Sequence, residues 1–81
     1  MSNDKIATPG SSNIASYAYA PARSALIVEF KDKSGNVTAT WEYAQVPPQV
    51  FDEMKKAESV GRFIRMRVIG YYEGREVSGK Q

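Results

Sequence analysis

Arginines and tyrosines are the residues of this chain whose types and spacing best suit the binding of a ligand. Arg62, Arg65 and Arg67 lie between Ser59 and Tyr72, a segment without an acidic residue. Guanidinium groups contact phosphates and tyrosine rings stack on unpaired bases, a combination typical of surfaces that hold single-stranded nucleic acid or a nucleotide. The candidate nucleic-acid-binding residues are Arg62, Arg65, Arg67, Tyr17, Tyr19 and Tyr71, and Tyr72 is a further tyrosine expected to stay partly exposed.

A simpler interpretation of the same residues remains open. The arginines also fit a solvated helix face, and the tyrosines fit rim positions with wet hydroxyls. In that case the small chain, with its exposed Tyr and Met side chains, would serve as a protein-interaction module. We therefore expect one of two kinds of partner. The first is RNA or another polyanion, and the second is a protein.

Catalysis is not expected, because the side chains that usually perform it are missing. The chain has no cysteine and no histidine, which removes the thiolate nucleophile, the usual base at neutral pH and the commonest metal ligands. Glu29 and Glu42 could face each other on neighbouring strands, but two solvent-facing strand residues explain them better. None of the six glycines forms a phosphate-binding loop. We expect a protein that is not an enzyme and that uses no cofactor and no metal.

Composition places the chain among small globular domains. It has 81 residues, of which 42% are apolar and 25% are charged, enough for one domain. Residues 53–81 carry seven basic and four acidic residues, so the positive charge gathers in the second half. No apolar run approaches the roughly 20 residues of a membrane helix, and the N-terminus does not resemble a signal peptide. A cytoplasmic protein without membrane association is the expectation.

Alternation of apolar and polar residues predicts three strands. They cover residues 13–19, 24–31 and 37–43, with a turn at Ala20–Arg23 and a second turn rich in Gly and Asn near Gly35. In the second strand Leu26, Val28 and Phe30 share one face. Trp41 or Tyr43 of the third strand can pair with that face across the hairpin.

A helix is predicted over residues 48–58. Pro48 suits its first turn, and Val50, Phe51, Met54 and Ala57 recur at helical spacing. Residues 59–69 are ambiguous: Ile64, Met66 and Val68 alternate as in a strand, whereas Val60, Ile64 and Val68 also fit a helical stripe after an N-capping Ser59. The predicted core consists of Leu26, Val28, Phe30, Trp41, Val50, Phe51, Met54 and Phe63.

An ordered set of residues gives the chain a family resemblance. The set comprises Ser11, Ser12, Ile14, Tyr19 and Pro21; Leu26, Val28 and Phe30; Trp41 and Tyr43; Val46 and Pro47; Phe51; and Ala57, Ser59, Gly61, Phe63, Val68 and Tyr71. In this order it resembles the KTSC domain, which occurs at the C-terminus of some lysyl-tRNA synthetases and as short free-standing bacterial and phage proteins. The chain departs from that pattern at Ala20, Trp41, Val60 and Arg65, where Asp, Tyr, Lys and Asn are common.

The resemblance implies a small α+β domain without known catalysis. The expected architecture is an antiparallel three-stranded meander followed by one or two C-terminal helices packed on one face, and the resemblance favours a helix for residues 59–69. Its link to a tRNA synthetase makes nucleic acid the natural ligand by analogy. The expected organisation is a flexible N-terminal tail at 1–10, the domain at 11–73 and a polar C-terminal tail at 74–81.

Overall fold

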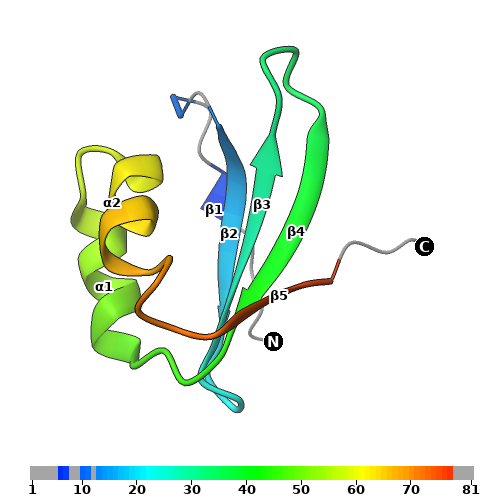
Figure 1. The fold of residues 1–81 in the computed structure, drawn as a ribbon. Helices are drawn as coiled ribbons and strands as arrows, with labels where there is room; N and C mark the ends of the chain where they lie inside the picture. Colours follow the sequence, from blue (N-terminus) through cyan, green and yellow to red (C-terminus); the bar gives the residue numbers. More distant parts are fainter. Residues whose placement is uncertain (1–5, 8–9, 12, 78–81) are drawn as a thin grey trace.

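The chain folds as one antiparallel sheet with two helices on one of its faces (Figure 1). The computed structural model describes residues 6–7, 10–11 and 13–77. The elements follow in the order β1 (Ile6–Ala7), β2 (Ile14–Ala20), β3 (Ala25–Lys31), β4 (Val37–Tyr43), α1 (Pro48–Lys56), α2 (Val60–Arg67) and β5 (Gly74–Glu76). The predicted α+β class is confirmed, with a meander followed by two helices.

Two short strands extend the sheet beyond the three that the sequence predicts. Its spatial order is β1-β2-β3-β4-β5, with Ile6 of β1 opposite Tyr17 and Gly74 of β5 opposite Tyr43. Both edge strands come from segments expected to be tails, at residues 1–10 and 74–81. They join the sheet by backbone pairing over two and three residues, too few for an alternating pattern to show. Residues 1–5, 8–9 and 78–81 of those segments lie outside the described part of the chain.

The register of the central strands decides which side chains face the helices. Val28 of β3 lies between Tyr17 of β2 and Trp41 of β4, while Leu26 lies between Tyr19 and Tyr43. Because side chains alternate along a strand, all six point to one face. This inner face therefore carries four aromatic rings beside two aliphatic side chains.

Local sequence explains where the elements begin and turn. Pro48 starts α1 immediately after Pro47, whose φ of −65° is extended, so neither proline interrupts the helix. In the β3–β4 hairpin the Oδ1 of Asp32 accepts hydrogen bonds from the backbone N–H groups of Ser34 and Asn36 at 2.9 and 3.0 Å. Gly35 takes a φ of +90° there, which a side chain would disfavour.

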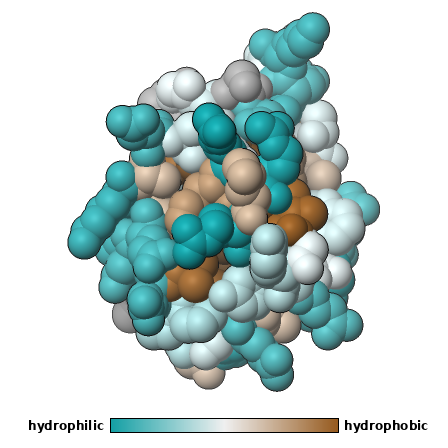
Figure 2. Space-filling model, turned by 60° about the vertical axis from the view of Figure 1, so that its left-hand side comes forward, coloured by the Kyte–Doolittle hydropathy of each residue, from teal (hydrophilic) through white to brown (hydrophobic). Residues whose placement is uncertain are grey.

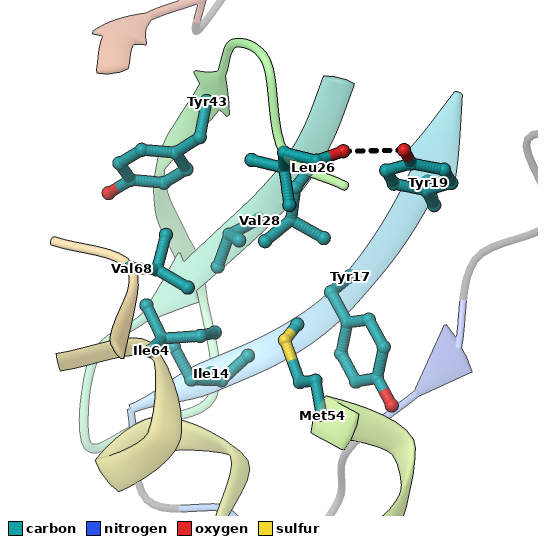
Figure 3. Close-up of a cluster of buried hydrophobic side chains, with 10 residues drawn as sticks. Ile14, Tyr17, Tyr19, Leu26, Val28, Tyr43, Met54, Ile64 and Val68 are labelled. Carbon is teal, nitrogen blue, oxygen red and sulfur yellow. Dashed lines mark hydrogen bonds between the residues drawn. The ribbon is translucent and has the colours of Figure 1, made fainter. Parts of the chain in front are cut away.

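The core fills the space between the inner sheet face and the helices (Figure 3). Its fully buried side chains are aliphatic or Met: Ile14, Leu26, Val28, Val46, Met54, Ile64 and Val68. Of the eight predicted core residues, Leu26, Val28 and Met54 are buried. The other five pack half-buried around this centre, and they are Phe30, Trp41, Val50, Phe51 and Phe63. The rings of Tyr17, Tyr19 and Tyr43 on the inner sheet face are buried as well.

Candidate nucleic-acid interface

Helix α2 carries the candidate arginines and is positioned by its cap and its apolar face. The Oγ of Ser59 accepts a hydrogen bond from the backbone N–H of Arg62 at 3.2 Å, which caps the helix. Ile64 and Val68 are buried against the sheet, so the helical interpretation of this segment is correct. Arg62 and Arg65 are both exposed, and residues three apart on a helix are surface neighbours.

A polar cleft, here called the arginine cleft, opens where α2 begins. It has a volume of about 370 Å³ and is lined by Gly10, Ser11, Asn13, Ser59, Gly61, Arg62 and Arg65. Gly61 lets the chain before β2 approach the helix, because a Cβ there would lie 2.5 Å from Oδ1 of Asn13. The Oγ of Ser11 accepts a hydrogen bond from the N–H of Ile14 at 3.1 Å, which fixes Ser11 at the side of the cleft formed by the chain before β2. Two guanidinium groups thus share one cleft with hydroxyl and amide groups.

Arg67 does not line the arginine cleft with Arg62 and Arg65. Its Nη2 lies 3.2 Å from Oε1 of Glu53 on α1, and its guanidinium lies over the ring of Phe63, 5.3 Å from the ring centre. The ion pair ties Arg67 to α1. Arg67 does not line the arginine cleft, but it lines an adjoining hollow together with Ser59 and Arg62, which line both. The side chains of Arg67 and Glu53 are 60% and 43% exposed, so this ion pair is weak, but it places a carboxylate beside the guanidinium to which a phosphate would bind.

The expected exposure of Tyr17 and Tyr19 is wrong. Their exposed fractions are 3% and 7%, because α1 covers them and the ring of Phe51 packs against both. Phe51 stacks on Tyr19 with ring centres 5.1 Å apart and meets Tyr17 edge-on at 5.8 Å. The hydroxyl of Tyr19 donates to the carbonyl of Val46 (Figure 3). Neither ring can stack on a base, whereas Tyr71 is 72% exposed.

A second hollow, here called the aromatic cavity, was not foreseen. It has a volume of about 480 Å³, and its lining residues are Phe30, Ala39, Trp41, Tyr43, Ile69, Gly70, Tyr72 and Gly74. The rings of Trp41 and Tyr43 are nearly parallel, with centres 6.3 Å apart and planes at 22°. Alternation in β4 did place these rings on the same face as Phe30. No local signal showed that residues 69–74 would cross that face and leave a space.

The opposite face of the sheet holds ion pairs and polar contacts. Glu42 lies 2.8 Å from Arg23 and 3.9 Å from Arg75, and Glu29 accepts a hydrogen bond from the hydroxyl of Ser16 at 2.7 Å. The two carboxylates considered for acid–base chemistry are thus engaged by different partners. Residues 6–7, 10–11 and 13–77 contain no group of three side chains placed to ligate a metal ion.

The helices are too short and too polar to cross a membrane within the described chain. Figure 2 looks toward the side that carries the helices and shows hydrophobic surface exposed among polar side chains. Exposed apolar side chains at the C-terminal end of α2 and just beyond it are Met66, Ile69 and Tyr71.

Comparisons with known proteins agree with this fold. The sequence model of the KTSC domain matches residues 10–72, more than half of the chain. A protein from Tsukamurella paurometabola is 44% identical over 54 residues, which are 67% of this chain and 73% of the relative. The crystal structure of a KTSC domain protein from Yersinia pestis superposes with a TM-score of 0.80 at 26% identity, covering 91% of this chain and 96% of the other. The chain therefore belongs to the KTSC domain family.

Proposed function

We propose that this KTSC domain is a non-catalytic module that binds single-stranded RNA, with Arg62 and Arg65 as the phosphate contacts. One observation carries the proposal. Of the five arginines in the chain, Arg23, Arg67 and Arg75 each lie within 4 Å of a carboxylate, and no carboxylate among the described residues pairs with Arg62 or Arg65. An unpaired guanidinium retains its full capacity for a charged phosphate ligand.

The surroundings of this pair support an anionic ligand. Both arginines line the arginine cleft with Ser11, Asn13 and Ser59, whose side chains can bond to phosphate or ribose oxygens. The cleft lies at the N-terminal end of α2, where the helix dipole is positive. Phosphate contacts of this kind give affinity with little sequence preference.

Salt dependence tests the proposal directly. Two contacts on a single strand predict a slope of log K against log salt of about −1.4, at about −0.7 for each contact. We expect Arg62→Gln and Arg65→Gln each to reduce that slope by about 0.7, measured by fluorescence anisotropy with a labelled oligouridine. Circular dichroism should show both variants folded, because both side chains are exposed.

Arg75→Gln is the matched control, since it removes the same charge from the other face of the sheet. Its side chain is 75% exposed, and Glu42 keeps Arg23 at 2.8 Å. We expect its slope to equal that of the unchanged protein. Equal effects of all three substitutions would show a diffuse charge effect, and no binding of oligouridine at low salt would overturn the proposal.

A protein-interaction module is the second candidate, and the exposed Met66, Ile69 and Tyr71 favour it. These side chains are 55%, 45% and 72% exposed and follow one another at the end of α2. Met and Tyr are enriched in the cores of protein interfaces. Affinity purification from native lysate separates the two candidates: RNA lost on nuclease treatment supports the first, and a stoichiometric protein that survives it supports the second.

A further inference from the structure

The aromatic cavity has the size and the rigidity of a ligand site. Its volume of about 480 Å³ lies in the range of small-molecule pockets, roughly 300–1,000 Å³. The chain that crosses it is held at both ends. The N–H groups of Tyr71 and Tyr72 both donate to the carbonyl of Val68, at 3.0 and 3.1 Å, and the N–H of Ala44 donates to the carbonyl of Glu73 at 2.9 Å. The space is therefore built into the fold.

Two glycines determine the path of residues 69–74, the segment that crosses the cavity. Gly70 takes a φ of +88°, which turns the chain away from the end of α2. Gly74 brings the backbone against the Tyr43 ring, where an added Cβ would lie 2.5 Å from Cε1. Between these contacts the segment stands off the sheet, and the cavity remains beneath it.

The walls suit a flat aromatic ligand. Trp41 and Tyr43 present two nearly parallel rings, and Phe30 and Tyr72 add aromatic surface. Stacking of a base on aromatic side chains contributes about 1–3 kcal/mol and tolerates any base, because each has a π-face. The mostly apolar side chains of this lining offer little to distinguish one base edge from another, so weak sequence preference is expected.

The positions of nearby charged residues indicate from which side a nucleic-acid strand would reach the cavity. Ile69 lines it and lies two residues beyond the C-terminal end of α2, the helix that carries Arg65. Arg62 lies one further turn back along α2. At the other end β5 pairs with β4, where Glu76 lies opposite Trp41. A nucleic-acid strand would thus approach from the α2 side.

We propose that the aromatic cavity holds one nucleobase of a single strand whose neighbouring phosphates contact Arg62 and Arg65. This inference rests on the proposed function and adds to it the site at which a base binds. A peptide with an apolar anchor is the competing occupant. The arginine cleft, at the start of the helix that leads to Ile69, places two cations beside polar side chains and fits a sugar–phosphate chain better than an apolar peptide.

Trp41 is the single tryptophan of the chain and lines the cavity, so its fluorescence reports occupancy. The ligands are hexamers of oligouridine and oligoadenosine, an abasic hexamer with the same phosphates, and free adenosine. We expect both base-bearing hexamers to quench Trp41 and to bind about 5- to 150-fold more tightly than the abasic strand, the factor that corresponds to one stacked base.

Two variants test the cavity without touching the arginines. Ala39→Leu fills it from β4, and Tyr72→Ala removes part of its wall; circular dichroism verifies that at least one is folded. A folded variant should bind all hexamers with the affinity that the unchanged protein has for the abasic strand. Because Arg62 and Arg65 are intact, the salt slope should stay the same.

The outcomes separate the two proposals. If abasic and base-bearing hexamers bind equally and both depend on Arg62 and Arg65, the base site is overturned and the proposed function stands. If no hexamer binds but adenosine quenches Trp41 and Ala39→Leu abolishes the quenching, the cavity accepts a base and the proposed function fails. If no hexamer binds, adenosine does not quench Trp41, and a purified protein partner does, both proposals are wrong.

Discussion

The hydroxyl of Tyr19 joins β2 to the segment that leads into α1. It donates to the carbonyl of Val46, and the two residues are 7% and 0% exposed. Tyr19→Phe keeps the ring that stacks on Phe51 and removes the donor. We expect the free energy of unfolding to fall by about 1–3 kcal/mol in urea denaturation, the usual cost of a buried acceptor that loses its partner. Tyr71→Phe, at a side chain 72% exposed, should change it by less than about 0.5 kcal/mol.

Two other tyrosines make stability sensitive to alkaline pH. Burial raises the pKa of Tyr17 and of Tyr43 above the ordinary value of about 10. Above pH 10 these phenols ionise first in the unfolded chain, so their stabilising contribution is full below about pH 10 and is lost as pH rises through the folded pKa. We expect the urea midpoint to fall across this range, and less steeply in Tyr17→Phe/Tyr43→Phe. An unchanged pH profile in that variant would contradict the assignment.

The side chains show where prediction from sequence reached its limit. Alternation correctly placed Tyr17 and Tyr19 on one strand face, but exposure depends on what packs over that face. Phe51 of α1 covers both rings, a contact between segments more than 30 residues apart that no local pattern encodes. The arginines were easier, because the surface position of a charged residue needs no knowledge of its partners. Arg67 is the exception, since its pairing depends on Glu53 of another helix.

At the scale of elements, the apolar residues of α2 fit both the two-residue repeat of a strand and the 3.6-residue repeat of a helix. Ile64 and Val68 lie on one face in either a strand or a helix. Met66 between them distinguishes the two structures, because it would share their face only in a strand. It is 55% exposed, whereas Ile64 and Val68 are 1% and 0% exposed. The strands and α1 were predictable because their patterns fit one period alone. The helical identity of α2 came from the family resemblance.

The two helices contain a matched pair of methionines. Met54 of α1 is 0% exposed and Met66 of α2 is 55% exposed. Met54→Ala should lower the free energy of unfolding by about 2–5 kcal/mol, because it empties part of the core. Met66→Ala should change it by less than about 0.5 kcal/mol, since alanine favours a helix and no buried contact is lost. Chemical denaturation measures both, and a similar loss in the two variants would contradict the burial described here.

At the scale of the whole molecule, β5 connects the sheet to the aromatic cavity. Its Gly74 lies on the Tyr43 ring, and the N–H of Val77 donates to the carbonyl of Thr40 at 2.7 Å. A chain ending at residue 73 should lose about 1–3 kcal/mol of stability, because these hydrogen bonds and the cover of Tyr43 are removed. A chain ending at residue 77 keeps β5 and serves as the control. Identical urea curves for the two chains would show that β5 adds nothing to the fold.

The sheet order also has a kinetic consequence. Strands β1 to β4 pair with their neighbours in sequence, whereas the β4–β5 pair encloses both helices, residues 44–73. Contacts between near neighbours close small loops and form quickly, and a contact that closes a long loop forms late. The β2–β3–β4 meander is thus the natural nucleus, and β5 completes the molecule after α1 and α2 have docked. Strand β5, which supplies Gly74 to the lining of the aromatic cavity, is then the last strand to pair and the first to separate on unfolding, while the central strands stay paired.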